Sequence, residues 1–205
     1  MRFSAVVLAA GISSRMQGTH KMLLPIGAEP VIRRTVRQVL AANPQEVVVV
    51  TGHNGRAVIE ALIDLPVSFQ PNPRYQEGQM ISVALGAGAL RQPTDAVMIC
   101  LGDMVLLRTE DYREVVDAFT AMPRGSILVP RHHGQRGNPL VFAAHHAQEV
   151  MSGEKNIGCR KLIADHPEEV FAYETAHDRY TTDMDTPEDY AAILVRLALA
   201  PTETA

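Results

Sequence analysis

The sequence predicts an α/β fold built as three layers around a mostly parallel sheet. Apolar runs rich in β-branched residues alternate with amphipathic segments of helical period through the first 122 residues. The runs are apolar at nearly every position, as in strands that helices cover on both faces. The chain has 205 residues, of which 46% are hydrophobic and 20% charged. These proportions are typical of one globular domain.

Four strands and four helices are expected in the first part of the chain. Each expected helix carries apolar residues three or four positions apart, and Ile63 belongs to the stripe of the second one. Thr109 is expected to cap the fourth helix, with Glu110 and Asp111 in the first turn, where they complement the helix dipole. In chain order we expect a strand at 3–9, a helix at 30–42, a strand at 46–51, a helix at 54–65, a strand at 66–70, a helix at 79–90, a strand at 96–101 and a helix at 109–122.

The pattern changes after residue 122. Strands are expected at 126–130, 139–143 and 168–174, the first two flanking a polar turn. Thr186 is expected to cap a helix that runs to about Leu199, because Pro187 follows it and an acid lies three residues after it. The tail after it is expected to fray. We therefore expect one domain over residues 1–205, with a smaller β-containing insertion at about 123–185 and a C-terminal helix at 186–199.

Composition excludes several classes of function. A net charge of −4 argues against a general nucleic-acid binder, and 5% aromatic residues without tryptophan argue against a stacking platform. The apolar run at 5–10 is too short for a signal peptide, and no stretch approaches the ~20 residues that span a bilayer. The two cysteines, Cys100 and Cys159, fit a reducing cytoplasmic location, and Cys100 is expected in the core.

A loop able to bind phosphate follows the first strand. Small residues at 9–11 let the backbone approach a ligand, and exposed N–H groups there can form an anion-binding nest. Arg15 adds a planar fork for phosphate and Lys21 a mobile charge. The loop is neither a P-loop, because Thr19 follows Gly18, nor a G-x-G-x-x-G turn. Taken alone, it is better interpreted as a plain strand-to-helix loop with solvated cations.

Carboxylates occur where metal ligands would be useful. Asp103 follows the fourth expected strand, and ligands bind at that edge of open α/β sheets. The Asp103 carboxylate suits Mg²⁺, which takes oxygen ligands. The simpler interpretation is that Asp103 caps a helix or turn. Asp183 and Asp185 face the same side of an extended stretch. The segment 72–83, read alone, is a turn followed by a helix N-terminus.

The remaining polar positions lie in the second half. Arg136 is either a solvated side chain of a hairpin turn or a contact for an acceptor. The histidine pairs at 132–133 and 145–146 have no Cys or acid at recognised zinc spacing, so we interpret them as solvated turn residues.

Together these segments resemble the MobA-like nucleotidyltransferases, which have the nucleotide-diphospho-sugar transferase fold. The stretch LAAGISSRMQGTHKMLLP is similar to the family signature L-A-[AG]-G-x-S-x-R-M-G with its later Lys and Pro, although Gln17 replaces the usual Gly. The Ala-Ala-Gly form looks like the molybdenum cofactor cytidylyltransferase branch. The segments N-P-R-Y-Q-E-G-Q-M-I-S, L-G-D, R-G-N-P and D-M-D-T-P-E-D follow in family order, with Met104-Val105 in place of x-Pro and Asn156 in place of an Asp.

The resemblance implies a role for each matching residue. Residues 1–122 would form the nucleotide-binding half and 123–185 the acceptor side. Arg15, Lys21 and Asp103 would be catalytic, and Asp103 with Asp185 would hold Mg²⁺, Asp183 being the alternative to Asp185. The acceptor would meet Arg136, Gly137, Asn138 and Arg160. The nucleotide would be held by Leu8, Ala9, Ala10, Gly11, Arg15, Lys21, Gly78, Gln79 and Ser82.

The activity so implied is transfer of a nucleoside monophosphate, CMP being favoured, from an NTP to a phosphorylated acceptor with release of pyrophosphate. CTP and molybdopterin are the favoured substrates, with a molybdoenzyme or its chaperone as a partner. GTP with molybdopterin, CTP with methylerythritol phosphate, and a phospholactate-type guanylyltransferase remain alternatives. So does a non-catalytic nucleotide-sensing or chaperone module, although such a module would not need metal-binding carboxylates.

Overall fold

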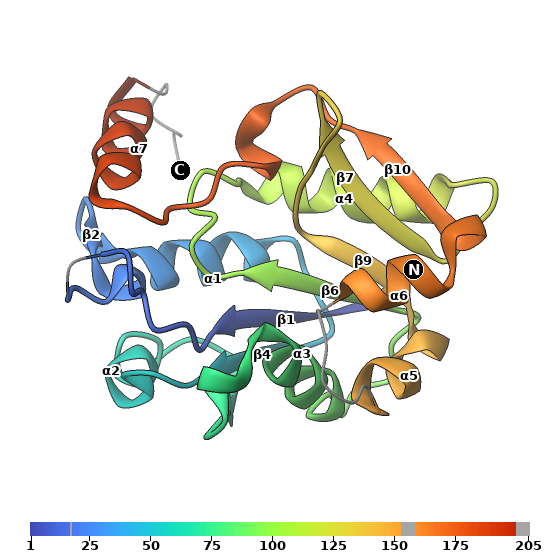
Figure 1. Cartoon of the computed structure of the whole chain (residues 1–205), viewed down its shortest axis with the longest axis horizontal. Coiled ribbons are helices and arrows are strands. Elements are labelled where there is room, and N and C mark those ends of the chain that lie inside the picture. Colours follow the sequence, from blue (N-terminus) through green and yellow to red (C-terminus); the bar gives the residue numbers. More distant parts are fainter. Residues whose placement is uncertain (17, 153–158, 200–205) are drawn as a thin grey trace.

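A computed structural model, which describes residues 1–16, 18–152 and 159–199, confirms the α/β class with a mostly parallel sheet (Figure 1). The strands of the main sheet are β1 (Phe3–Ala9), β4 (Val47–Thr51), β5 (Ser68–Pro71), β6 (Ala96–Leu101), β7 (Ile127–His132), β8 (Gln135–Arg136), β9 (Leu140–Ala143) and β10 (Val170–Glu174). They lie in the order β10-β7-β9-β6-β1-β4-β5, and β8 pairs with β7.

Strand direction changes only in the second half of the chain. β1 pairs in parallel with β4 and β6, and β4 in parallel with β5. β9 runs antiparallel to both β6 and β7, whereas β10 is again parallel to β7. One continuous sheet therefore joins the two halves, and the carboxyl ends of β1, β4 and β6 meet at one edge, where ligands bind in open α/β sheets.

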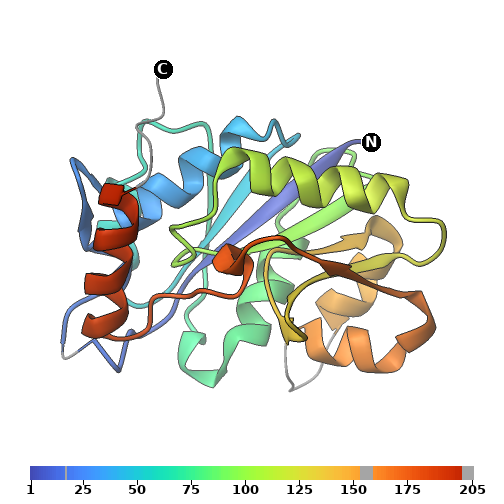
Figure 2. The same cartoon turned by 90° about the horizontal axis from the view of Figure 1, so that it is seen from above.

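Helices cover both faces of the sheet, as Figure 2 shows from above. One core cluster takes side chains from α1 (Val31–Ala41), α2 (Gly55–Glu60) and α4 (Thr109–Ala121). The other takes them from α3 (Gln79–Gly88), α5 (Ala147–Ser152) and α6 (Cys159–Asp165). A two-stranded sheet of β2 (Pro25–Ile26) and β3 (Glu29–Pro30) precedes α1.

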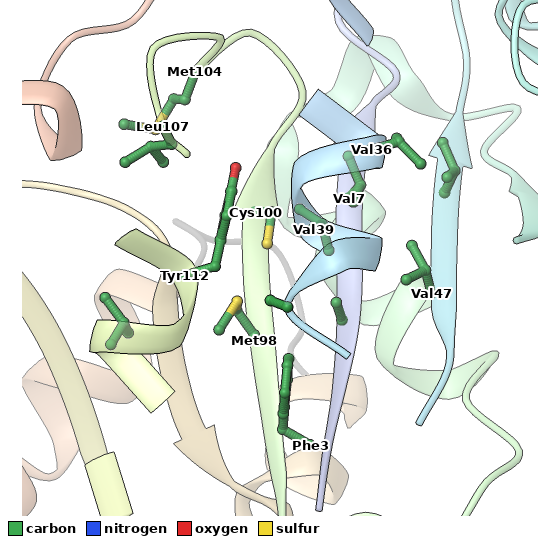
Figure 3. Packing of buried hydrophobic residues seen from close by; sticks show 14 of the residues in the cluster. Phe3, Val7, Val36, Val39, Val47, Met98, Cys100, Met104, Leu107 and Tyr112 are labelled. Atoms are coloured by element: carbon green, nitrogen blue, oxygen red, sulfur yellow. The ribbon is translucent and has the colours of Figure 1, made fainter. Parts of the chain in front are cut away.

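The first cluster explains why the central strands are apolar throughout. Figure 3 shows Val36 and Val39 of α1 beside Val7 of β1, and Cys100 of β6 between α1 and α4. All four are at most 1% exposed, and each such aliphatic side chain contributes about 1.5–3 kcal/mol relative to an exposed one. Burial raises the pKa of the Cys100 thiol, so the expectation of a core residue is confirmed.

The last helix, α7 (Pro187–Leu199), begins as its sequence predicts. The Asp189 amide donates to Thr186 Oγ1 (3.1 Å) and the Thr186 amide to Asp189 Oδ2 (2.8 Å), which is a capping box. Ile193 packs in a third cluster with Ile26 and Met184. α7 thus covers the carboxyl edge beside β2 (Figure 1). The tail expected to fray, residues 200–205, lies outside the described residues.

Two expectations from the sequence are wrong, and two helices were not expected. α2 ends at Glu60 and Ile63 is 70% exposed, because the chain turns where the Ala61 carbonyl accepts a hydrogen bond from Arg33 (3.0 Å). Thr109 is the first residue of α4, not its cap, since its hydroxyl donates to Gln38 Oε1 (2.6 Å). The helices α5 and α6 were not expected, because six or seven residues carry too few apolar positions to reveal a period.

Among the described residues, no helix combines the length and apolar character that a membrane crossing requires.

Candidate active site

The carboxyl ends of three strands are joined by backbone hydrogen bonds. The Gly102 amide after β6 donates to the Leu8 carbonyl of β1 (3.0 Å), and the His53 amide after β4 donates to the Ala10 carbonyl (3.2 Å). A Cβ at Gly102 would lie 2.8 Å from Ile32 Cδ1 and 3.0 Å from the Leu8 oxygen. Glycine is therefore needed at 102, and the next residue, Asp103, is held close to the loop after β1.

The loop after β1 has the openness that a nucleotide requires. Leu8, Ala9 and Ala10 are buried, whereas Gly11 is exposed and a Cβ there would meet nothing within 4 Å. Ser13 adopts a left-handed conformation (φ 57°), and its Oγ accepts a hydrogen bond from the Lys21 amide (3.2 Å). The loop thus closes on itself and turns the Lys21 side chain toward β6.

Two aspartates and two cations form the centre of the site. Lys21 Nζ contacts Asp103 Oδ2 and lies 2.7 Å from Asp185 Oδ1. Arg15 Nη2 lies 2.6 Å from Asp185 Oδ2. The side chains of Lys21 and Asp103 are 12% and 9% exposed, against 22% for Asp185 and 67% for Arg15. The structure thus brings together the predicted catalytic residues and Asp185, the residue favoured over Asp183.

The charges in this centre perturb one another. Burial disfavours the Lys21 ammonium, but the carboxylates of Asp103 and Asp185 outweigh that effect and raise its pKa. Loss of hydration and the nearby charges of Asp185 and Asp103 raise the pKa of Asp183, although its side chain is exposed. The raised pKa of Asp183 thus reflects the negative charge of Asp103 and Asp185 as well as its own loss of hydration.

The loop after Asp103 is anchored although it lacks the proline of the family pattern. Met104 and Val105 are 2% and 1% exposed. Met104 packs in the core cluster of α1 and α4, and Val105 in the cluster beneath α7. Two buried apolar side chains thus position Asp103, a constraint that a proline would impose through its fixed φ.

The start of α3 faces the same edge. Gly78 has φ 118° and ψ 166°, a conformation reserved for glycine, and Gln79 opens the helix with an exposed side chain. Ser82 is 3% exposed, and its Oγ accepts a hydrogen bond from Asn72 Nδ2 (2.9 Å). Gly78 and Gln79 are therefore accessible, whereas Ser82 fixes the turn after β5 through Asn72.

The predicted acceptor residues lie beside the segment that leads to Asp185. The Asn138 amide donates to the Tyr180 carbonyl (2.8 Å), and a Cβ at Gly137 would lie 2.4 Å from that same oxygen. Arg136 and Arg160 are both exposed. Although the residue as a whole is exposed, partial loss of hydration at its guanidinium, with the charges of Arg160 and Arg131, lowers the pKa of Arg136. These arginines form a positive cluster suited to an anion.

Three aromatic residues near the nucleotide loop were missed by the sequence analysis. The rings of His20 and His53 lie 5.6 Å apart, and those of His53 and Tyr75 5.9 Å apart. A Cβ at Gly52, before His53, would lie 2.8 Å from Ala10 Cβ. The sequence could have indicated His53 as a site residue, because Gly52 and His53 directly follow a buried strand, as Asp103 does.

Cys159 and Asn156 complete the predicted positions. Burial raises the pKa of the Cys159 thiol to about 11, which leaves it protonated and unreactive at neutral pH. Asn156, expected near the acceptor, lies outside the described residues.

Comparison with known proteins agrees with this geometry. Residues 5–170 match the family model of the MobA-like NTP transferase domain. The bifunctional protein GlmU of Solibacter usitatus is 27% identical over 199 residues, which is 87% of this chain and 42% of that protein. GlmU of Alkalilimnicola ehrlichii is 36% identical over 110 residues, or 52% of this chain and 23% of that protein. The chain spans less than half the length of these relatives.

Solved structures share the fold over nearly the whole chain. A nucleotidyl transferase from Methanothermobacter has a TM-score of 0.81 at 25% identity, covering 96% of this chain and 99% of that one. CMP:2-keto-3-deoxy-manno-octonic acid synthetase, solved with CTP, has a TM-score of 0.77 at 15% identity, covering 97% and 99%. With a family model matched over residues 5–170 and the family's motifs gathered at one sheet edge, the chain belongs to the MobA-like NTP transferase domain family.

Proposed function

We propose that this protein is a Mg²⁺-dependent nucleotidyltransferase that moves a nucleoside monophosphate from an NTP to a phosphorylated small molecule. One observation carries the proposal: Lys21 Nζ lies between the carboxylates of Asp103 and Asp185, which are 82 residues apart in the sequence. Two carboxylates with two cations beside an open backbone loop match the needs of phosphoryl chemistry, namely positioning and charge neutralisation.

The residues fit a magnesium ion. Asp103 and Asp185 each direct an oxygen at one cation, the Lys21 ammonium, which stands in for a metal at this point. Magnesium takes oxygen ligands and uses one or two carboxylates together with substrate phosphates. When bound, the ion would supply charge neutralisation at the phosphates of the NTP.

The reaction needs no general base. A phosphate monoester has a second pKa of about 6 and is therefore a competent nucleophile at neutral pH. Its oxygen forms a bond to the α-phosphorus while the bond from that phosphorus to the bridging oxygen breaks, and pyrophosphate leaves with the electron pair. Lys21 and Arg15 neutralise the charge that develops on the leaving group, and the backbone at Ala10 and Gly11 holds the NTP.

CTP is the favoured nucleotide and molybdopterin the favoured acceptor. The Ala9-Ala10-Gly11 form supports the cytidylyltransferase branch, and the positive cluster of Arg136 and Arg160 suits a phosphorylated acceptor. A molybdoenzyme or its chaperone would then receive the product.

Pyrophosphate release and product mass distinguish the candidates. The protein is incubated with Mg²⁺ and each of the four NTPs, with molybdopterin, with sugar phosphates and without acceptor. We expect pyrophosphate only with CTP and molybdopterin, and a product heavier by one CMP. GTP-dependent release with the same acceptor would overturn the choice of nucleotide but keep the reaction. Thermal stabilisation by NTPs with no turnover for any pair would refute the enzyme and favour a nucleotide-sensing module.

A further inference from the structure

A cluster of histidines and glutamates lies far from the candidate active site. Within the described residues, one ligand atom each of His146, Glu149 and His166 lies within 4.8 Å of the other two. His146 is the last residue of the short turn between β9 and α5, Glu149 belongs to α5, and His166 directly follows α6. His146 is 3% exposed, so its interpretation as a solvated turn residue is wrong. Glu149 lies only three residues after His146, whereas His166 is brought to them by the fold.

The cluster sits at the opposite edge of the sheet from Asp103. Ala143 pairs with Ala96, the first residue of β6, whereas Asp103 follows the last one. Ser126 and Glu169, which contact His146, precede the first residues of β7 and β10. Six residues of strand separate the two edges by roughly 20 Å. Figures 1 and 2 likewise place α5 and α6 away from α7.

The geometry points to a Zn²⁺ site formed by His146 Nδ1, Glu149 Oε2 and His166 Nε2, which leaves the fourth tetrahedral position for water. His166 Nε2 lies 2.8 Å and His146 Nδ1 3.9 Å from Glu149 Oε2. Ligand atoms about 2.0–2.2 Å from a tetrahedral zinc lie roughly 3.4 Å from each other, so small side-chain movements would suffice. Imidazole nitrogens with a carboxylate favour zinc over Mg²⁺ or Ca²⁺.

The second nitrogen of each imidazole already faces a polar side chain outside the proposed ligand set. His146 Nε2 lies 2.6 Å from Ser126 Oγ and 3.4 Å from Glu169 Oε2. His166 Nδ1 lies 3.5 Å from Glu169 Oε1. Metal-bound histidines almost always use the other ring nitrogen in this way, which fixes the tautomer and ring orientation. Both rings thus direct one nitrogen at Glu149 and the other toward Glu169.

Charge also favours a metal over a set of ion pairs. The rings of His146 and His166 are 5.0 Å apart, and that of His145 lies 4.2 Å from His146. Protonated imidazoles at such distances repel each other. One dication compensates the Glu149 carboxylate while leaving every imidazole neutral, and its ligands would tie the turn before α5, α5 itself and the end of α6 together.

Zinc titration of the metal-free full chain tests the site. The Asp103→Asn/Asp185→Asn variant serves as the background, because it removes the carboxylates of the candidate active site. We expect one equivalent of Zn²⁺, a rise in Tm of roughly 5–10 °C at a free zinc concentration a hundred times Kd, and an X-ray absorption spectrum with two imidazoles and an oxygen at about 2.0–2.2 Å. No stoichiometric uptake would refute the proposal and leave an ion-pair cluster.

Single substitutions identify the ligands. His166→Ala and Glu149→Ala should each weaken zinc binding at least ~100-fold, and Glu169→Gln by about 10–100-fold. His177→Ala, at an exposed histidine of the same half, is the matched control and should bind as the background does. Without zinc, His166→Ala should keep its Tm within about 4 °C, since it loses a half-exposed pair. Unchanged zinc binding in His166→Ala and Glu149→Ala, or loss only in His145→Ala, would overturn the assignment.

Discussion

Replacing Lys21 by methionine tests the candidate active site most directly, because, of the side chains the structure describes, only that of Lys21 contacts the carboxylates of both Asp103 and Asp185. Methionine keeps the unbranched apolar stem but removes the ammonium from between Asp103 and Asp185. Turnover should fall at least ~100-fold, the usual effect of losing one group that stabilises transition-state charge. Pyrophosphate release with saturating NTP and Mg²⁺ measures this loss.

The same substitution should destabilise the fold by a predictable amount. Breaking a fully buried ion pair costs about 3–5 kcal/mol. Asp185 remains paired with Arg15 and is 22% exposed, so the cost here should be about 2–3 kcal/mol. That free energy corresponds to a fall in Tm of roughly 5–10 °C for a chain of this size. Added Mg²⁺ should recover more of this loss in Lys21→Met than it adds to the wild type, because both carboxylates become available.

Lys161→Met is the matched control. Within residues 1–16, 18–152 and 159–199, the ion-pair partner of Lys161 is Asp165, four residues along α6, and the Lys161 side chain is 58% exposed. Removing such a surface pair costs at most about 1 kcal/mol, and turnover should not change. If Lys21→Met kept near-normal turnover and a Tm within about 2 °C of the control, the carboxylates would not depend on Lys21 and the proposed centre would be refuted.

Three further substitutions address the surroundings of this centre. Asp103→Asn should abolish Mg²⁺-dependent pyrophosphate release while circular dichroism stays unchanged; residual turnover near the wild-type rate would contradict its role as a ligand. Met104→Ala removes a side chain that is 2% exposed, so urea unfolding should reveal a loss of about 2–5 kcal/mol together with lower turnover, and a loss below that range would show that the loop is not anchored there. Gly137→Ala places a Cβ 2.4 Å from the Tyr180 carbonyl oxygen; we expect a cost of about 1–3 kcal/mol and a higher KM for the acceptor with KM for the NTP unchanged, whereas equal changes in both would refute an acceptor-side position.

Local pattern was sufficient for the central strands and the long helices. β1 and β6 begin and end where the sequence predicts. A strand buried on both faces is apolar at nearly every position, so the change in residue type on each side marks its bounds. The same strands predict the site, since residues that follow them must lie at one sheet edge. Asp103, Gly11 and Lys21 were found by this argument together with the family motifs.

Short elements and side-chain partners were decided by tertiary contact. The early end of α2 depends on Arg33, which reaches the Ala61 carbonyl from α1. The caps differ in the same way: Thr186 forms its capping box within four residues, whereas the Thr109 hydroxyl is taken by Gln38 from a different helix. A hydrogen-bond partner about 70 residues away leaves no trace in local spacing.

The sequence by itself therefore determined the fold class, the order of the central elements and the residues gathered at the carboxyl edge, because hydrophobic period and strand order are local properties of the chain. Only the tertiary structure decided that Lys21 lies between two carboxylates 82 residues apart and that His166 meets both Glu149 and His146. Each of those contacts joins elements that are distant in sequence, so its geometry depends on how the helices pack against the sheet.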